Sequence, residues 1–325
     1  MLQDRRSTPP GAPRRPPLVS VVIPTLNEER NLPHVFAALP PGLHEVVLVD
    51  GGSSDNTVAV ARELRPDVVV VQQTRTGKGN ALASGFAACT GDAIVMIDAD
   101  GSTDPAEIQS FVSTLISGAE FAKGSRFGKG GHSHDITPLR RAGNEGLNFV
   151  VNKLFGTKFT DLCYGYNAFW RRVVPVMDLP PTDLPKPADG RKLWGDGFEI
   201  ETLINIRVAA SGMRVKEVSS IEHLRIHGMS NLNTFRDGAR VLRTIVSEFR
   251  RRSAQRRAEA KAAVAARVAE RRRAAAAADA APAKVVPVLA VPSSTWYGHV
   301  DELLTAEEQL TRHAEHGPAP VEARQ

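Results

Sequence analysis

Short runs of aliphatic and β-branched residues alternate with amphipathic stretches from Leu18 onward, and this alternation is the clearest pattern in the chain. Runs of the first kind predict strands at 19–23, 45–49, 68–71, 93–97 and 120–122. Apolar residues at helical spacing predict helices at 28–38, 55–64, 79–89 and 105–116. Strict alternation of strand and helix predicts βαβ units, and therefore a Rossmann-like α/β fold with a mostly parallel central sheet and helices on both faces.

The alternation stops after Arg126, where the second half of the fold begins. The pattern there predicts helices at 138–154, 197–210 and from about 232, strands at 214–218 and 222–226, a turn-rich stretch at 161–167 and a Pro-rich loop at 179–187. We therefore expect one domain at 18–250, with a first half at 18–126 and a second half at 127–250. A disordered Pro/Arg leader at 1–17 precedes it, and a basic Ala/Arg helix at 251–281 and a mostly disordered tail at 282–325 follow it.

Composition and charge narrow the class of protein. The 325 residues are 42% hydrophobic and 24% charged, which is the range of a globular chain. Two cysteines are too few for a disulfide framework, and there is neither an apolar run of about 18 residues nor a signal peptide. These features predict a cytoplasmic protein, or one that is peripheral on the inner face of the cell membrane.

The net charge of +5 is concentrated near the C-terminus. Residues 249–273 hold ten Lys or Arg against two Glu, a net charge of +8, so that the rest of the chain sums to −3. The basic character thus belongs to one segment, which does not argue for nucleic acid as a partner. It is either a solvated helix or an electrostatic contact with an anionic membrane surface through residues 250–273.

The sharpest chemical signal is an apolar strand that runs into two acids, Ile94-Val95-Met96-Ile97-Asp98-Ala99-Asp100-Gly101. Open α/β sheets place their ligand crevice at the carboxyl ends of strands. Two carboxylates there suit Mg²⁺ or Mn²⁺, which would neutralise a leaving diphosphate. The alternative is a solvated turn before the next helix.

Other strand ends are polar as well. The first ends in Pro24-Thr25-Leu26-Asn27-Glu28, where Asn27 can cap the helix and Glu28 can meet a ribose or base. The second ends in Asp50-Gly51-Gly52-Ser53, whose glycines permit close backbone approach. Thr76-Gly77-Lys78-Gly79 opens a helix whose amides and lysine can face an anion, although it lacks the Walker A spacing.

In this order, these segments resemble the family 2 glycosyltransferases of GT-A fold, most closely the dolichyl- or polyprenyl-phosphate mannosyl- and glucosyltransferase branch. The resemblance covers about residues 19–250 and implies a catalytic domain at 18–250, with a nucleotide-sugar half at 18–126 and an acceptor half at 127–250. Its motifs are VVIPTLNE at 21–28, VDGGS at 49–53, KGNA at 78–81, DAD at 98–100, GSR at 124–126, DLCYGY at 161–166, FEIE at 198–201 and RIHGMSNL at 225–232.

The resemblance implies inverting transfer of a hexosyl unit from a nucleotide diphosphate sugar, of GDP-mannose or UDP-glucose type, to an acceptor that we expect to be a polyprenyl phosphate. By the same match, the nucleotide-sugar residues would be Pro24, Thr25, Asn27, Glu28, Asp50, Gly52, Ser53, Lys78, Gly79, Asp98 and Ala99. Asp98 and Asp100 would hold Mg²⁺ or Mn²⁺, and Asp100 and Arg126 would be catalytic. Acceptor-binding residues would be Arg126, Arg140, Arg141, Arg225 and Ser230.

The sequence also departs from the family pattern at Gly51, Ser102, Glu199 and Asn231, which leaves the donor and the acceptor open. A lipid phosphate acceptor is already anionic and needs no general base. A hydroxyl acceptor needs one, and Asp196 and Glu199, near a helix start, are then the candidates. A cap or first-turn role is the alternative for both.

Two further classes of protein fit parts of the pattern. The strand ending in Asp98 and Asp100 also describes the nucleophile loop of Mg-dependent haloacid-dehalogenase-like phosphatases, but that loop normally lies near the start of its domain. A non-catalytic nucleotide-sugar binding module is the other alternative. A dinucleotide oxidoreductase is disfavoured because the glycine turn at 77–81 lacks a third glycine.

Overall fold

The structure is a computed structural model that describes residues 15–189, 192–228 and 234–279. The predicted tail at 282–325, most of the predicted leader and the candidate residue Ser230 lie outside these residues. The chain divides into two units, 1–262 and 263–325. The sheet described below belongs to the first unit, and the second contains residues 263–279 of the last helix.

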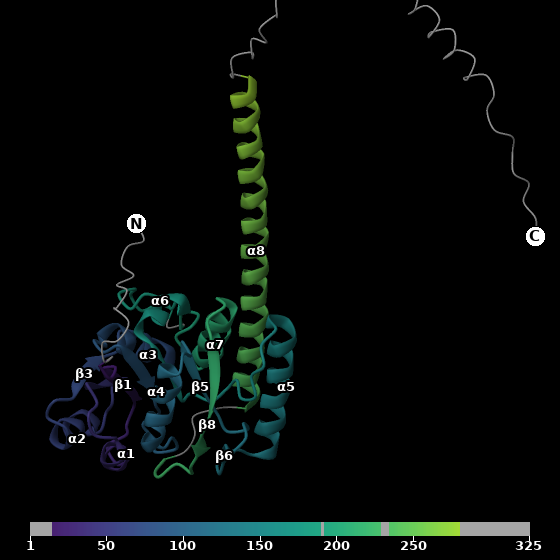
Figure 1. Ribbon diagram of the computed structural model, residues 1–325. Coiled ribbons are helices and arrows are strands. Elements are labelled where there is room, and N and C mark those ends of the chain that lie inside the picture. The colour runs from purple at the N-terminus through teal and green to yellow at the C-terminus, as the bar shows by residue number, and fades with distance from the viewer. Residues whose placement is uncertain (1–14, 190–191, 229–233, 280–325) are drawn as a thin grey trace, which may run out of the picture. The chain divides into compact units, whose positions relative to one another are not determined.

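A sheet forms the centre of the first unit (Figure 1). It has seven strands in the order β3-β2-β1-β4-β7-β5-β8. The strands are β1 (Val19–Thr25), β2 (Glu45–Asp50), β3 (Val69–Gln72), β4 (Ala93–Met96), β5 (Phe121–Ser125), β7 (Asn167–Trp170) and β8 (Val215–Ser219). Only β7 runs against its neighbours, because it pairs antiparallel with both β4 and β5. The predicted mostly parallel sheet is therefore confirmed.

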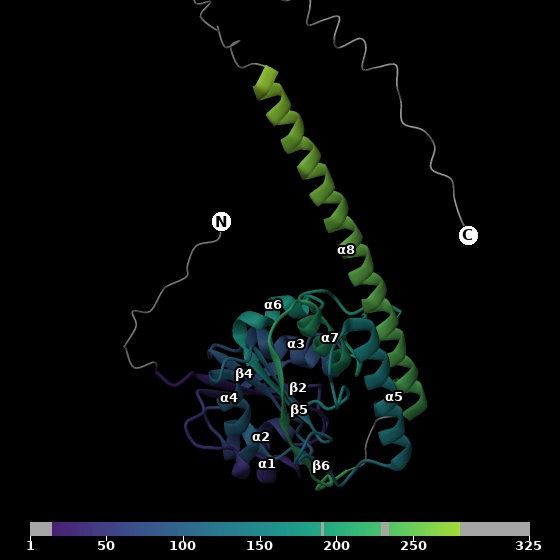
Figure 2. The ribbon, with the colours of Figure 1, turned by 45° about the vertical axis from the view of Figure 1, so that its right-hand side comes forward.

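Helices cover both faces of this sheet (Figures 1 and 2). They are α1 (Leu32–Ala38), α2 (Thr57–Leu64), α3 (Lys78–Ala88), α4 (Ile108–Ile116), α5 (Pro138–Phe155), α6 (Val174–Met177), α7 (Ile200–Ala210) and α8 (Thr234–Asp279), with 3-10 turns at Pro105–Glu107 and Arg171–Val173. Residues of α1 and α4 share one apolar cluster with the sheet, and residues of α3 and α7 share the other.

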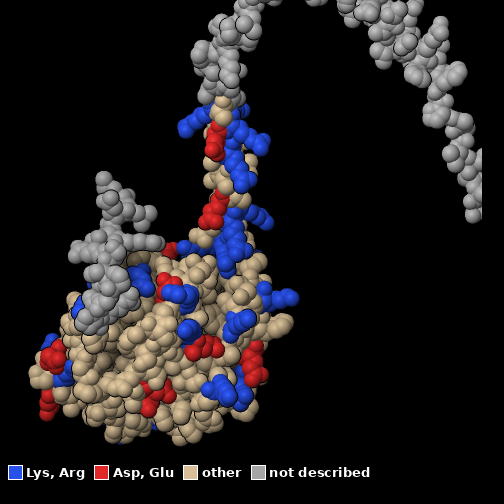
Figure 3. Space-filling view, viewed as in Figure 1, with Lys and Arg blue, Asp and Glu red and all other residues tan. Residues whose placement is uncertain are grey.

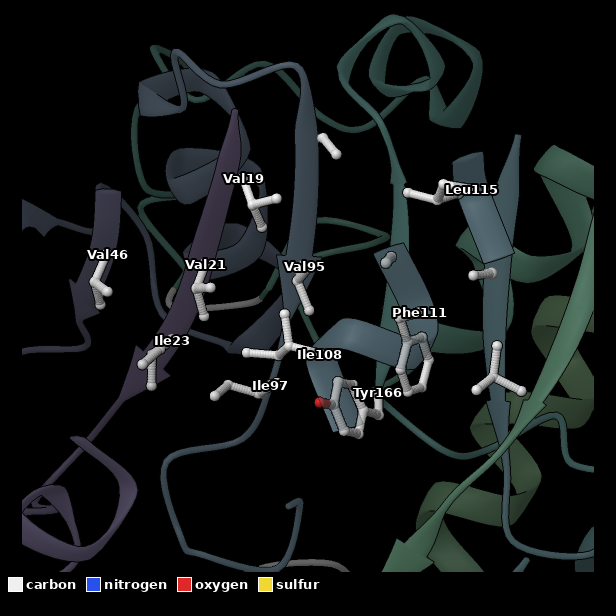
Figure 4. Close-up of a cluster of buried hydrophobic side chains, with 14 of the residues drawn as sticks. Val19, Val21, Ile23, Val46, Val95, Ile97, Ile108, Phe111, Leu115 and Tyr166 are labelled. Carbon is white, nitrogen blue, oxygen red and sulfur yellow. The ribbon is translucent and has the colours of Figure 1, made fainter. Parts of the chain in front are cut away.

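The alternation of side chains along each strand explains this layering. Val21 and Ile23 point to the α4 side and Val22 to the α3 side, and all three are fully buried. Figure 4 shows the α4 side, where Phe111 stacks on Tyr166 with ring centroids 4.2 Å apart. Strands buried on both faces read as continuous apolar runs, which is why the sequence located them well.

A third apolar cluster joins α5 and α7 to the last helix. Val151 and Phe155 of α5 meet Ile206 of α7 and Val241 and Ile245 of α8. The helix predicted from about residue 232 and the predicted Ala/Arg helix form one continuous helix, α8, of 46 residues. Within the described residues, no helix has the length and apolarity needed to cross a membrane.

Three local predictions were wrong or incomplete. Strand β7 follows the turn-rich stretch and was not predicted, because four residues beginning with Asn carry little strand signal. The strand expected at 222–226 is reduced to β9 (Ile221–Glu222), which pairs with β6 (His132–Ser133). Asn27 does not cap α1: that helix begins at Leu32 after Asn31, with a proline in its first turn.

Candidate active site

A cavity of about 520 Å³ opens at the carboxyl ends of the central strands. Its wall includes the end of β1, the turn that follows β4, the start of α3, the N-terminal part of α5 and residues from α7 and α8. Ten of the predicted site residues line it: Pro24, Thr25, Glu28, Lys78, Asp98, Ala99, Asp100, Arg126, Arg140 and Arg225. The structure thus brings donor-side and acceptor-side predictions into one space.

Other predicted donor residues do not line the cavity. The Asp50 carboxylate accepts hydrogen bonds from the amides of Gly52 (3.2 Å) and Ser53 (3.1 Å). The Ser53 hydroxyl accepts the Asn27 amide at 2.9 Å, and Asn27 Oδ1 accepts the Ser54 amide at 2.8 Å. These hydrogen bonds hold the two strand-end loops in shape, and none of Asn27, Asp50, Gly52 and Ser53 is a lining residue.

The glycine turn before α3 has a packing function. Gly77 has a φ of +131°, and a Cβ there would lie 2.1 Å from the carbonyl oxygen of Asp196. A Cβ on Gly79 would lie 1.8 Å from the carbonyl oxygen of Gly195, and the Gly79 amide already donates to the Asp196 carbonyl at 2.9 Å. Glycine is required here because another segment of the chain crosses the helix start, and Gly79 does not line the cavity.

Lys78, the first residue of α3, lies between two carboxylates. Its Nζ is 2.6 Å from Asp98 Oδ1 and 2.6 Å from Glu201 Oε1. Burial disfavours the ammonium, but the charges of Asp98 and Glu201 outweigh it and raise the pKa of Lys78 above its ordinary value. The lysine is thus a fixed positive charge in the cavity wall.

Asp98 and Asp100 follow β4 in a tight turn in which Gly101 has a φ of +77°. Asp100 Oδ2 is 2.7 Å from Arg225 Nη1, and its Oδ1 accepts the Ser102 amide at 3.0 Å. The segment expected as a strand at 222–226 covers this turn instead. Its contacts are a bridge between Thr103 and Glu222 and hydrogen bonds to the carbonyls of Ser102 and Asp100.

The acidic turn carries enough negative charge to affect its neighbour Glu28. Burial is the main cause that raises the pKa of Glu28, and the charges of Asp100 and Asp98 raise it further. The described residues contain no group of three or more His, Cys, Asp or Glu arranged to hold a metal. Two carboxylates still fit Mg²⁺ or Mn²⁺, because such ions take their other ligands from substrate phosphates and water.

Arg126 is buried and its guanidinium is engaged on two sides. Nε and Nη2 donate to the Asp161 carboxylate at 2.7 and 2.9 Å, and Nη1 donates to both Glu222 oxygens at 3.0 Å. Burial opposes the charge, yet Asp161 and then Glu222 raise the pKa of Arg126. It therefore connects the loop after α5 to the segment that covers the acidic turn.

The other predicted acceptor-binding residues differ in whether they line the cavity. Arg140 and Arg225 line the cavity, whereas Arg141 does not and forms an exposed pair with Glu145 at 3.2 Å. The two candidate general bases do not line the cavity either. Asp196 is buried against Arg75, and Glu199 Oε1 accepts the amides of Gly195 (3.1 Å) and Gly197 (3.2 Å).

Glu201 is the carboxylate that the sequence interpretation missed. It lies in the first turn of α7, only two residues after Glu199, and it lines the cavity beside Lys78. Helical geometry supplies the signal, because residues two apart on a helix face in different directions. Once α7 starts at Ile200, Glu199 turns back to the loop and Glu201 faces the site.

Comparisons with known proteins agree with this arrangement. The model of the family described as Glycosyl transferase family 2 matches residues 20–176. An uncharacterized glycosyltransferase of Mycobacterium tuberculosis is 32% identical over 219 residues, which cover 66% of this chain and 89% of that protein. A dolichol-phosphate mannosyltransferase of Pyrococcus furiosus is 30% identical over 224 residues, 66% of this chain and 59% of that protein.

The fold also has solved counterparts. A glucosyl-3-phosphoglycerate synthase from Mycobacterium tuberculosis, solved in complex with Mn²⁺, UDP-glucose and phosphoglyceric acid, superposes with a TM-score of 0.55. The match covers 72% of this chain and 80% of that one, at 23% sequence identity. At this identity the likeness concerns the fold, with its mostly parallel sheet and covering helices.

Proposed function

We propose that this chain, which belongs to glycosyl transferase family 2, has the GT-A fold and is a glycosyltransferase, acts on a polyprenyl phosphate. In this reaction it transfers a hexosyl unit from a nucleotide diphosphate sugar to the lipid phosphate. The observation that carries the proposal is one cavity whose wall includes Asp98, Asp100 and Lys78 together with Arg140 and Arg225, the last of which is paired with Asp100. The acidic turn suits a diphosphate and its metal, and the arginines suit a second phosphate.

The donor end is the region around Pro24, Thr25 and Glu28, next to the acidic turn. Asp98 and Asp100 are the residues that would hold Mg²⁺ or Mn²⁺, and the bound ion would supply charge neutralisation for the diphosphate. Mn²⁺ accompanies UDP-glucose in the solved counterpart, which supports a divalent ion here. Lys78, fixed between its two carboxylates, contributes a positive charge beside the same phosphates.

The acceptor end is basic. Arg140 lines it, Arg225 joins it to the acidic turn through its 2.7 Å contact with Asp100, and Arg126 holds the loops around it through Asp161 and Glu222. A lipid phosphate reaches this end already anionic, so its oxygen attacks the anomeric carbon without a general base. The bond from that carbon to the nucleoside diphosphate breaks, and the configuration at the carbon inverts. The burial of Asp196 against Arg75 and of Glu199 against backbone amides agrees with such a base-free reaction. The Pyrococcus furiosus relative, named for dolichol phosphate and mannose, supports this acceptor class.

Helix α8 provides a second link to lipid. Basic side chains gather along it in Figure 3, and its residues 254–274 are exposed. The net charge of +8 at 249–273 attracts an anionic membrane surface, where each basic residue contributes about 1 kcal/mol. The partner of this segment is thus the inner leaflet that holds the acceptor.

The phosphatase alternative is not favoured. The family model and the relatives that match this chain are those of glycosyltransferases. A non-catalytic binding module would bind the donor and release no nucleotide. The test below separates it from an enzyme.

The test is release of nucleoside diphosphate from GDP-mannose, UDP-glucose and UDP-GlcNAc, each with and without Mn²⁺ and with a short-chain polyprenyl phosphate. We expect one donor to react only when metal and lipid phosphate are both present. An Asp98→Ala, Asp100→Ala double variant should lose the reaction. It should also lose the metal-dependent rise in unfolding temperature that the donor causes in the wild type. Binding without release would favour the module, and no binding of any sugar nucleotide would overturn the proposed function.

A further inference from the structure

Glu201 is the last residue of the FEIE motif but received no function in the sequence analysis, yet it makes one of the shortest contacts in the cavity. Its Oε1 lies 2.6 Å from Lys78 Nζ, and the side chains of Glu201 and Lys78 are only 12% and 14% exposed. Asp98, the other partner of Lys78, is 30% exposed and lies in the candidate metal-binding turn. The lysine thus has one partner that faces ligand and one that is withdrawn from solvent.

Gly165 makes room for this pair. A Cβ at residue 165 would lie 2.6 Å from Glu201 Oε1 and 3.2 Å from Lys78 Nζ. The φ of Gly165 is not in the left-handed region, so the backbone conformation does not explain why this residue is a glycine. The reason is the space that the Glu201 carboxylate needs beside the Lys78 ammonium. Three segments far apart in the sequence therefore meet to build this one contact.

A buried ammonium needs a carboxylate in every state of the site. If Asp98 binds a divalent ion, Lys78 no longer has the Asp98 carboxylate as its ion-pair partner. We propose, on the basis of the function proposed above, that Glu201 is a positioning residue that keeps Lys78 compensated and in place while Asp98 binds the metal. Glu201 acts through Lys78 and does not itself touch the donor.

The proposal has a direct consequence for metal affinity. In a Glu201→Gln variant, Asp98 is the remaining carboxylate at Lys78 Nζ, so the ion must compete with the ammonium for it. Loss of an outer-shell partner typically weakens metal binding about 10- to 100-fold, and we expect an effect in this range. Gly165→Ala should act in the same direction without changing any charge, because the added methyl group displaces the Glu201 carboxylate.

The experiment is a calorimetric titration of Mn²⁺ into the full-length protein, with saturating UDP in one series and saturating GDP in the other. The variants are Glu201→Gln, Gly165→Ala, Lys78→Met and the double variant of residues 78 and 201. Glu248→Gln is the matched control, because Glu248 is also a buried glutamate paired with a cation, Arg207 at 2.7 Å, and does not line the cavity. Thermal unfolding establishes that each variant is folded.

We expect weaker Mn²⁺ binding in Glu201→Gln and Gly165→Ala, wild-type binding in Glu248→Gln, and little further effect of Glu201→Gln once residue 78 is Met. Wild-type Mn²⁺ affinity in Glu201→Gln, or additive effects of the substitutions at 78 and 201, would overturn the inference alone. If Lys78→Met does not fold, the Gly165→Ala variant is the test instead. Wild-type Mn²⁺ affinity in Gly165→Ala would then overturn the inference. If the wild type binds neither UDP nor GDP in the presence of Mn²⁺, the proposed function is overturned, and this inference, which rests on it, is overturned as well.

Discussion

Arg75 and Asp196 form a bidentate ion pair, with Nε to Oδ2 at 2.7 Å and Nη2 to Oδ1 at 2.9 Å, and each side chain is 1% exposed. The same arginine donates to the carbonyls of Pro181 and Leu184, and the Asp196 carbonyl accepts the Gly79 amide. This pair therefore fastens the segment after α6 across the start of α3. A residue that looked like a general base in the sequence has a structural partner instead.

Asp196→Asn should destabilise the fold, because it leaves the Arg75 guanidinium buried without a counter-charge. Breaking one side of a buried pair costs about 3–5 kcal/mol, which urea unfolding at pH 7 would measure. Asp67→Asn, which breaks an exposed pair with Arg65, is the control and should change nothing measurable. A large loss of kcat with unchanged unfolding free energy would instead return Asp196 to catalysis.

Gly79→Ala and Gly146→Ala should have opposite effects on stability. The added Cβ at Gly79 meets the Gly195 carbonyl at 1.8 Å, so we expect a loss of about 3 kcal/mol or more. Gly146 is exposed in the middle of α5 with nothing within 4 Å of its Cβ position, and alanine there should gain about 0.5–1 kcal/mol. Chemical unfolding of the two variants compares them directly, and equal stabilities would contradict the close crossing at Gly79.

The two thiols should be unreactive in the folded protein at pH 8. Burial raises the pKa of Cys89 to about 12, and burial followed by the charge of Asp161 raises the pKa of Cys163 to about 12. Because the thiolate is the reactive form, labelling by a disulfide reagent should be at least about 100-fold slower than in urea. The native rate should rise with pH across the alkaline range. Rapid labelling of one thiol per folded chain would contradict this.

Neutralising part of α8 should weaken membrane binding in a salt-dependent way. Replacing Arg256, Arg257 and Lys261 with Gln removes three charges, worth about 3 kcal/mol at an anionic surface. Co-sedimentation with vesicles of 30:70 phosphatidylglycerol and phosphatidylcholine would measure the loss. A variant with Lys at 256 and 257 and Arg at 261 keeps the charge and should bind like the wild type. Binding that survives high salt would show that charge is not the cause.

The sequence located the strand ends well because their signals are local. Apolar runs fixed β1 and β4, and the Asp98–Asp100 turn follows β4 as expected. The errors concern contacts between distant segments. Glu201 was missed in favour of Glu199 because the exact start of α7 decides which carboxylate faces the cavity.

The sequence analysis singled out the glycines before α3, but it did not give the packing contact that requires them. The turn at Gly77 and Gly79 was expected to face an anion, whereas its closest neighbour is the chain at 195–196. The segment 222–226 has the composition of a strand, yet it lies over the acidic turn, since Ser102 and Asp100 offer it carbonyl partners. Neither relationship is visible without the tertiary structure, because each joins residues more than 100 positions apart.

The antiparallel strand β7 has a consequence for how the protein is made. Strand β5 pairs only with β7 and β8 among the described strands, so it cannot join the sheet when it leaves the ribosome. The edge of β4 stays open until Trp170 has emerged, some 70 residues after β4 itself. Nascent chains that stop before this point expose an apolar sheet edge, and they are the species that a chaperone would need to shield.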